Sequence, residues 1–133
     1  GYTFIHPFDD SEVIAGQGTL GLEIVEDLPG VDTVVLPVGG GGLAAGVAVA
    51  IKALKPGVRL VGVQTARVPS LAAALEAGGP RPVPSKPTLA DGINVPLVGR
   101  HPFPFLRQHL SEVVLVEEKL GVTMTEIIKS EKN

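Results

Sequence analysis

Four consecutive glycines, Gly39, Gly40, Gly41 and Gly42, are the residues of this sequence best suited to bind a ligand. They follow an apolar run at residues 34–38, typical of a buried strand, and precede small apolar residues at 43–54, typical of a helix. The start of a helix exposes unpaired backbone N–H groups and carries about half a positive charge. Because glycine has no Cβ, a phosphate can approach those groups closely. The pattern predicts an anion-binding loop; the alternative is a tight turn whose glycines only permit close packing.

Three classes of phosphate site use such a loop. A nucleotide P-loop requires Gly-Lys-Ser or Gly-Lys-Thr, and the Leu43-Ala44-Ala45 found here excludes that class. A dinucleotide site has the pattern G-x-G-x-x-G/A, which residues 40–45 satisfy, but it also needs an acidic residue about 20 positions later to hold the ribose. Gln64 stands there, which weakens the dinucleotide interpretation without removing it. The third class, pyridoxal phosphate, has a single phosphate that fits a glycine loop.

Three motifs carry a family resemblance. Residues 14–20 (IAGQGTL), 37–46 (PVGGGGLAAG) and 90–93 (ADGI) resemble, in order and spacing, the threonine dehydratase and serine racemase family of fold-type II pyridoxal-phosphate enzymes. The resemblance runs from about residue 4 to about residue 120. It implies that pyridoxal 5'-phosphate is the cofactor and that its pyridine ring lies beside Gly92. The residues implied to cradle its phosphate are Gly39, Gly40, Gly41, Gly42 and Leu43.

The resemblance also implies an activity. A threonine dehydratase is an ammonia-lyase that converts L-threonine or L-serine to a 2-oxo acid and ammonium, a reaction of amino-acid metabolism such as isoleucine biosynthesis. Two alternatives stay open. One is a serine racemase-like enzyme on the same scaffold, and the other is a non-catalytic α/β domain that binds a phosphorylated ligand or a nucleotide.

The catalytic lysine of the family has no counterpart in this sequence. The family carries it in a Ser-x-Lys-x-Arg-Gly context, and none of the six lysines here has that context. Each is typical of a solvated helix face, a helix end or a loop. The six are Lys52, Lys55, Lys86, Lys119, Lys129 and Lys132. We therefore expect no catalytic residue in this chain and no activity from the chain alone.

The two ends of the sequence suggest a piece of a larger enzyme. The first residue is Gly1 rather than Met, and residues 127–133 break off a helical pattern without a Gly or Pro stop. We expect residues 1–133 to form a single α/β domain, a fragment whose uncovered surface favours self-association into a homo-oligomer.

The sequence lacks acidic side chains where metal-binding relatives have them. Gln64 stands where metal-binding relatives have an acidic residue, and residues 65–70 contain no carboxylate. Neutral oxygens alone suit magnesium or calcium poorly, so we predict no metal site. His6, which precedes Pro7, is interpreted as part of a turn, and His101 and His109 as surface residues.

Composition excludes other classes of function. The net charge of −3 gives no electrostatic reason to bind nucleic acid or an anionic membrane. The sequence has no cysteine and no apolar run long enough to cross a membrane. We expect a cytoplasmic protein that acts on a small molecule.

Strand-like and helix-like segments alternate along the chain. Helices are predicted at residues 13–27, 43–54, 70–77, 103–110 and from 117 onward. Strands are predicted at 34–38, 59–63 and 112–116, and residues 2–5 form a short β-like run. This order predicts an α/β fold in three layers, a mostly parallel sheet with helices on both faces. Gly16, Gly18 and Gly21 weaken the first helix, so we expect them to pack closely against a neighbour.

Overall fold

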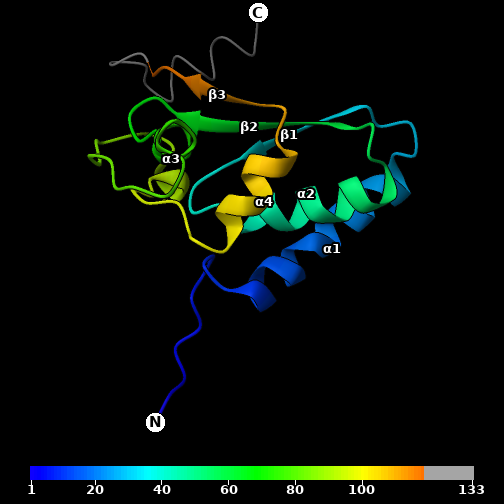
Figure 1. Cartoon of the computed structure of the whole chain (residues 1–133), viewed down its shortest axis with the longest axis horizontal. Helices are drawn as coiled ribbons and strands as arrows, with labels where there is room; N and C mark the ends of the chain where they lie inside the picture. Colours follow the sequence, from blue (N-terminus) through cyan, green and yellow to red (C-terminus); the bar gives the residue numbers. More distant parts are fainter. Residues whose placement is uncertain (119–133) are drawn as a thin grey trace, which may run out of the picture.

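The computed structural model describes residues 1–118 of the 133-residue chain (Figure 1). Helices and strands alternate as the sequence predicts. In chain order they are α1 (Ser11–Asp27), β1 (Thr33–Pro37), α2 (Gly42–Leu54), β2 (Arg59–Thr65), α3 (Ser70–Ala77), the 3-10 helix η1 (Asp91–Ile93), α4 (Pro102–His109) and β3 (Glu112–Val116). No helix in residues 1–118 is long and apolar enough to span a membrane.

The three strands form one parallel sheet in the order β1-β2-β3. Val35 is in register with Val61, and Val63 with Val114. Parallel neighbours need a crossover connection, which α2 provides between β1 and β2. The carboxyl ends of all three strands therefore lie at one edge of the sheet, which is where ligands bind in open α/β sheets.

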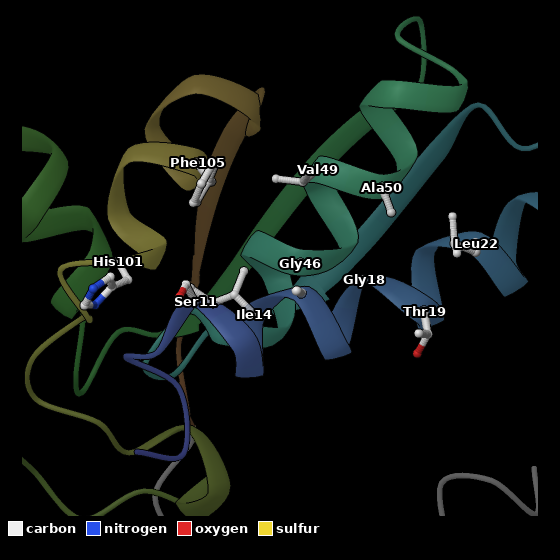
Figure 2. Close-up of a pocket in the computed structure, with 11 residues that line it drawn as sticks. Ser11, Ile14, Gly18, Thr19, Leu22, Gly46, Val49, Ala50, His101 and Phe105 are labelled. Carbon is white, nitrogen blue, oxygen red and sulfur yellow. The ribbon is translucent and has the colours of Figure 1, made fainter. Parts of the chain in front are cut away.

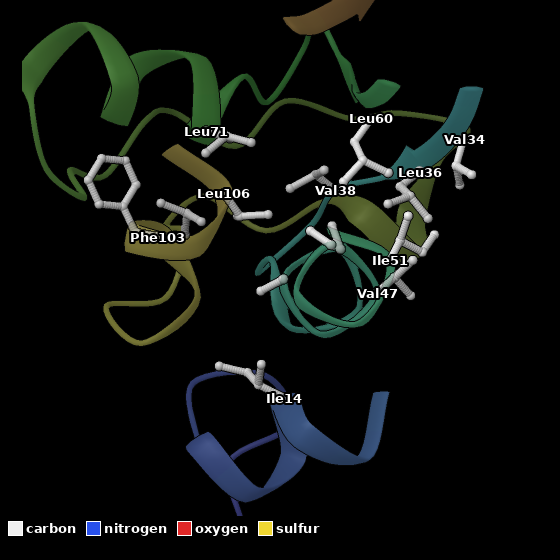
Figure 3. Close-up of a cluster of buried hydrophobic side chains, with 14 of the residues drawn as sticks. Ile14, Val34, Leu36, Val38, Val47, Ile51, Leu60, Leu71, Phe103 and Leu106 are labelled. Carbon is white, nitrogen blue, oxygen red and sulfur yellow. The ribbon is translucent and has the colours of Figure 1, made fainter. Parts of the chain in front are cut away.

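One face of the sheet carries the hydrophobic core (Figure 3). In β1, Val34 and Leu36 are buried against α2, while Val35 on the opposite face is 61% exposed. Side chains of α3 and α4 join the same core, so the four α-helices lie on this side of the sheet (Figure 1). The predicted α/β class with a parallel sheet is confirmed. The second helical layer has no counterpart within residues 1–118.

Helix α1 packs on α2 through glycines. A Cβ on Gly18 would lie 3.2 Å from the carbonyl oxygen of Gly46, and one on Gly21 would lie 2.9 Å from that of Val47. A Cβ on Gly46 would in turn overlap the backbone of α1. The close packing predicted for the glycines of this helix is therefore confirmed at Gly18 and Gly21. It is wrong at Gly16, whose Cβ position has nothing within 4 Å.

The β-like run at residues 2–5 does not form a strand, and Tyr2, Phe4 and Ile5 are largely exposed. A strand is stable only when a neighbouring strand pairs with its backbone N–H and C=O groups. The aromatic and β-branched residue types at 2–5 favour a strand but do not supply that partner. At the other end, Glu117 and Glu118 follow β3 without forming a helix, and the rest of the predicted final helix lies outside the described residues.

Candidate functional site

The glycine run connects β1 to α2, and α2 begins without a side chain that caps its N–H groups. Gly41 is the N-cap residue, with a φ of 100° that favours glycine, and no side chain caps the helix. The first intrahelical bond runs from Ala45 N–H to the Gly41 carbonyl, 2.9 Å long. Within the described chain, the N–H groups of Gly42, Leu43 and Ala44 donate to no protein atom. The first turn contains no acidic residue, so these three donors form a positively polarised site.

A pocket of about 280 Å³ opens in front of these donors. The glycine run and Leu43 form one side of it, and Gly92 and Ile93 lie on its lining as well. The six residues that the resemblance assigned to the cofactor, separated by up to 53 positions (92 − 39), thus line a single pocket. Gln17, from α1, also lines it.

Protein atoms occupy the space next to every glycine of the run. A Cβ on Gly39 would lie 3.2 Å from Ile93 Cα, and one on Gly41 would lie 2.8 Å from Leu106 Cδ1. A Cβ on Gly40 would overlap the ring of Phe8. Close packing therefore requires these glycines. The first turn of α2 also keeps three N–H donors free, so the geometry is compatible with anion binding as well.

No sequence pattern indicates that Phe8 contacts this loop. Its position is set by a turn in which His6 Nδ1 accepts hydrogen bonds from the N–H groups of Asp9 at 2.8 Å and Phe8 at 3.3 Å. The His6 and Phe8 rings meet edge to face, with centroids 4.6 Å apart. His6 therefore belongs to a turn, as predicted.

Gln64 has a structural role that sequence reasoning missed. It is buried, and its Nε2 donates to the Val38 carbonyl at 3.0 Å. Its Oε1 accepts from the N–H groups of Leu71 at 2.8 Å and Ala72 at 3.3 Å, which caps the start of α3. Both ends of the amide are thus used inside the fold, and Gln64 does not line the pocket in front of α2.

A carboxylate secures the loop that carries Gly92. Glu118 accepts hydrogen bonds from the hydroxyls of Thr88 and Thr65 and from the N–H of Leu89. These donors, with the charge of Arg67 nearby, outweigh burial and hold the pKa of the Glu118 carboxyl below its ordinary value. Glu118 is therefore the ionised centre of a small network at the carboxyl ends of β2 and β3.

Asp9 forms a second carboxylate contact, with the start of α4. Its Oδ1 accepts from the His101 backbone N–H at 2.7 Å and lies 2.9 Å from His101 Nδ1. Burial raises the pKa of the Asp9 carboxyl, but the hydrogen bonds from His101 and Arg100 outweigh it and hold the pKa below its ordinary value. Residues 1–118 contain no group of three or more acidic or histidine side chains able to hold a metal.

The described lysines lie away from the pocket. Lys52 Nζ donates to the carbonyls of Pro56, at 3.0 Å, and Val58, beyond the end of α2. Lys55 and Lys86 do not line the pocket either. Lys119, Lys129 and Lys132 lie outside the described residues.

A second, larger pocket in the described part of the chain is an apolar groove of about 520 Å³ between α1, α2 and α4 (Figure 2). Apolar side chains dominate its lining, among them Ile14, Leu22, Val49 and Phe105. Figure 2 shows Ser11 and His101 at one end of the groove and Thr19 near the other end. Because it lacks convergent hydrogen-bond donors, it is a poorer ligand site than the start of α2.

A parallel α/β sheet with an uncapped, glycine-bounded helix start at its carboxyl edge is typical of proteins that bind a phosphate group. Comparison with known families agrees and is more specific: residues 1–131 match the model of the pyridoxal-phosphate dependent enzymes, and the chain belongs to that family. The cofactor fits the residues present, because three free N–H donors and no nearby carboxylate in the first turn of α2 suit its phosphate.

Individual relatives are similar over most of the chain. The L-threonine ammonia-lyase of Thermotoga maritima is 54% identical over 119 residues, which are 90% of this chain and 30% of that protein. Threonine deaminase isoform 2 from Solanum lycopersicum superposes with a TM-score of 0.84 at 40% identity, covering 88% of this chain and 34% of its own. Maize serine racemase superposes with a TM-score of 0.82 at 34% identity, covering 96% and 38%. The chain thus spans about a third of the length of these relatives.

Proposed function

We propose that the complete protein is a pyridoxal-phosphate-dependent threonine ammonia-lyase, which converts L-threonine or L-serine to a 2-oxo acid and ammonium. The observation that carries the proposal is the start of α2, where three backbone N–H groups stand free behind a glycine run. The relatives add the reaction: the Thermotoga maritima protein is an L-threonine ammonia-lyase and the Solanum lycopersicum structure is a threonine deaminase.

The residues of this chain would bind and orient the cofactor. Gly39, Gly40, Gly41, Gly42 and Leu43 would hold its phosphate. Gly92 would lie beside the ring, since its Cβ position has nothing within 4 Å. The bound cofactor supplies a ring that withdraws electrons from the substrate Cα. The apolar Ile93 and Val95 would exclude water from one side of the pocket.

No catalytic residue is assigned to the described chain. The lysine that the reaction needs would come from another part of the complete protein, since no described lysine lines the pocket. We accordingly expect residues 1–133 alone to be inactive, and we propose that the complete protein is a cytoplasmic homo-oligomer serving amino-acid metabolism such as isoleucine biosynthesis.

A serine racemase-like enzyme is the second candidate, favoured by the superposition on maize serine racemase. Both reactions start from the same cofactor and use the same phosphate loop. Their products differ, because a lyase yields a 2-oxo acid and a racemase yields the D-amino acid. Product analysis of the complete protein with L-threonine and L-serine therefore tests the proposal. Formation of a 2-oxo acid is expected, while D-serine as the main product would favour the racemase.

The phosphate loop is tested separately by Gln17→Glu. Gln17 is exposed and lines the pocket, so the substitution adds a negative charge near the phosphate without disturbing the core. A like charge at short range costs about 1 kcal/mol, so the affinity for pyridoxal phosphate should fall about fivefold to tenfold. Leu20→Glu, at an exposed position of α1 outside the pocket, is the charge-matched control. Equal affinities in the two variants would argue against phosphate binding at the start of α2.

A further inference from the structure

The wall of the pocket facing the glycine run is formed by a loop rather than by a long helix or strand. Between Pro87 and Ile93 the chain has only the short 3-10 helix η1. Ile93 nevertheless packs closely on the glycine run, 3.2 Å from the Cβ position of Gly39. Because the loop has little regular structure of its own, its position depends on contacts with the rest of the fold.

Two of the hydrogen bonds that join this loop to the rest of the fold end on Glu118. Its Oε2 accepts from the Leu89 N–H at 3.0 Å, and its Oε1 accepts from the Thr88 hydroxyl and, at 3.1 Å, from the Thr65 hydroxyl. The Thr88 oxygen in turn accepts from the Ala90 N–H at 3.1 Å. Both carboxylate oxygens are therefore used, and they join β2 to the loop.

The connection continues through backbone hydrogen bonds to the pocket. The Ile93 N–H donates to the Ala90 carbonyl at 3.1 Å, and the Val95 N–H donates to the Ile93 carbonyl at 2.9 Å. A second contact supports the same loop, since the Arg67 guanidinium donates to the Pro87 carbonyl. The negative charge of Glu118 fits this position, because every neighbour that it contacts is a donor and Arg67 is a cation.

We infer that Glu118 is a positioning residue for the cofactor: its carboxylate holds the loop at residues 87–93 so that Gly92 and Ile93 form the wall beside the pyridine ring. The inference rests on the proposed binding of pyridoxal phosphate in this pocket. Glu118 does not line the pocket in front of α2, so it acts through the loop and touches no reacting atom. It should therefore affect binding of the ring and leave the phosphate donors of α2 unchanged.

Glu118→Gln in the complete protein tests this role. Glutamine keeps the size of the side chain but offers one acceptor oxygen, so either Leu89 or the threonine hydroxyls lose their acceptor. We expect the Leu89 amide to exchange with solvent about tenfold faster and the affinity for pyridoxal phosphate to fall about threefold to tenfold, as loss of a charged hydrogen bond predicts. The affinity for inorganic phosphate, which needs only the start of α2, should stay within about twofold.

Glu117→Gln is the matched control, because Glu117 is exposed and its side chain makes no hydrogen bond within residues 1–118. It should leave all three measurements unchanged. The inference is overturned if Glu118→Gln behaves like Glu117→Gln, or if it weakens pyridoxal phosphate and inorganic phosphate equally. Failure of the wild-type protein to bind pyridoxal phosphate would refute the proposed function and this inference with it, whereas a failure of the inference alone leaves wild-type binding intact.

Discussion

Two separate requirements select glycine at positions 39–42. The glycines of the run are required both by close protein contacts and by the helix start that they precede. Gly41 shows this best, since its φ of 100° and its proximity to Leu106 each disfavour a side chain. A substitution such as Gly41→Asp would consequently disturb the fold as well as the phosphate. Changes at the exposed rim, such as Gln17→Glu, separate the two effects.

Gln64 permits a prediction about stability. Gln64→Glu removes the donor to the Val38 carbonyl and places a carboxylate in a buried site, although the acceptor of the α3 cap is retained. We expect the free energy of unfolding at pH 7 to fall by about 2–4 kcal/mol, as measured by urea denaturation. Gln17→Glu is the control, since the same change at an exposed position should cost less than about 0.5 kcal/mol. A similar stability for the two variants would contradict the stabilising role of the buried hydrogen bond from Gln64 to the Val38 carbonyl.

The residues of this site differ in how well the sequence predicts their roles. The phosphate loop was predictable because its signal is local: a strand, four glycines and a helix in succession. The contacts of Phe8, Gln64 and Glu118 were not predictable, because each has a partner that is distant in sequence. Gln64 and Val38 are 26 positions apart, and Glu118 and Thr88 are 30 positions apart. A glutamine after a buried strand has no pattern that distinguishes a helix cap from a ligand contact.

At the scale of elements, the contact between α1 and α2 explains why glycines are tolerated inside a helix. Each interior glycine costs about 1 kcal/mol relative to alanine, and close approach of the two helices offsets that cost where the glycine faces the partner. Gly18 and Gly46 face each other across this contact, whereas Gly16 faces open space.

Alanine substitutions should separate these two situations. Gly46→Ala places a Cβ against the backbone of α1 and should destabilise the protein by about 1–3 kcal/mol through overpacking. Gly16→Ala meets no atom within 4 Å and should stabilise α1 by about 0.5–1 kcal/mol. Thermal unfolding of both variants gives the comparison, and a stabilising Gly46→Ala would show that the helices are not in close contact.

Predicted and observed element boundaries agree where the element has a packing or pairing partner in the fold. The strand at residues 112–116 and the helix at 70–77 coincide with β3 and α3. The exception, at residues 2–5, had strand-like residues without a neighbouring strand. Residue type thus predicted an element correctly only where a neighbouring strand or helix was present in the fold. Such a neighbour depends on tertiary structure and cannot be read from local residue type.

For the molecule as a whole, we propose that the chain provides one part of an active site. In this proposal it supplies the phosphate loop, the wall beside the pyridine ring and the carboxylate that positions this wall. One face of its sheet is exposed at Val35, Val114 and Val116, and the chain spans about a third of the length of its relatives. We therefore attribute turnover to the complete protein and cofactor anchoring to these residues.

We propose that the start of α2 binds the phosphate of pyridoxal phosphate, and a titration with that compound followed by amide chemical shifts can decide whether it does. The amides of Gly42, Leu43 and Ala44 should shift first and saturate together, because their N–H groups are the free donors. Inorganic phosphate should reproduce these shifts at higher concentration. Shifts confined to the groove between α1 and α4, with these three amides unchanged, would contradict the account.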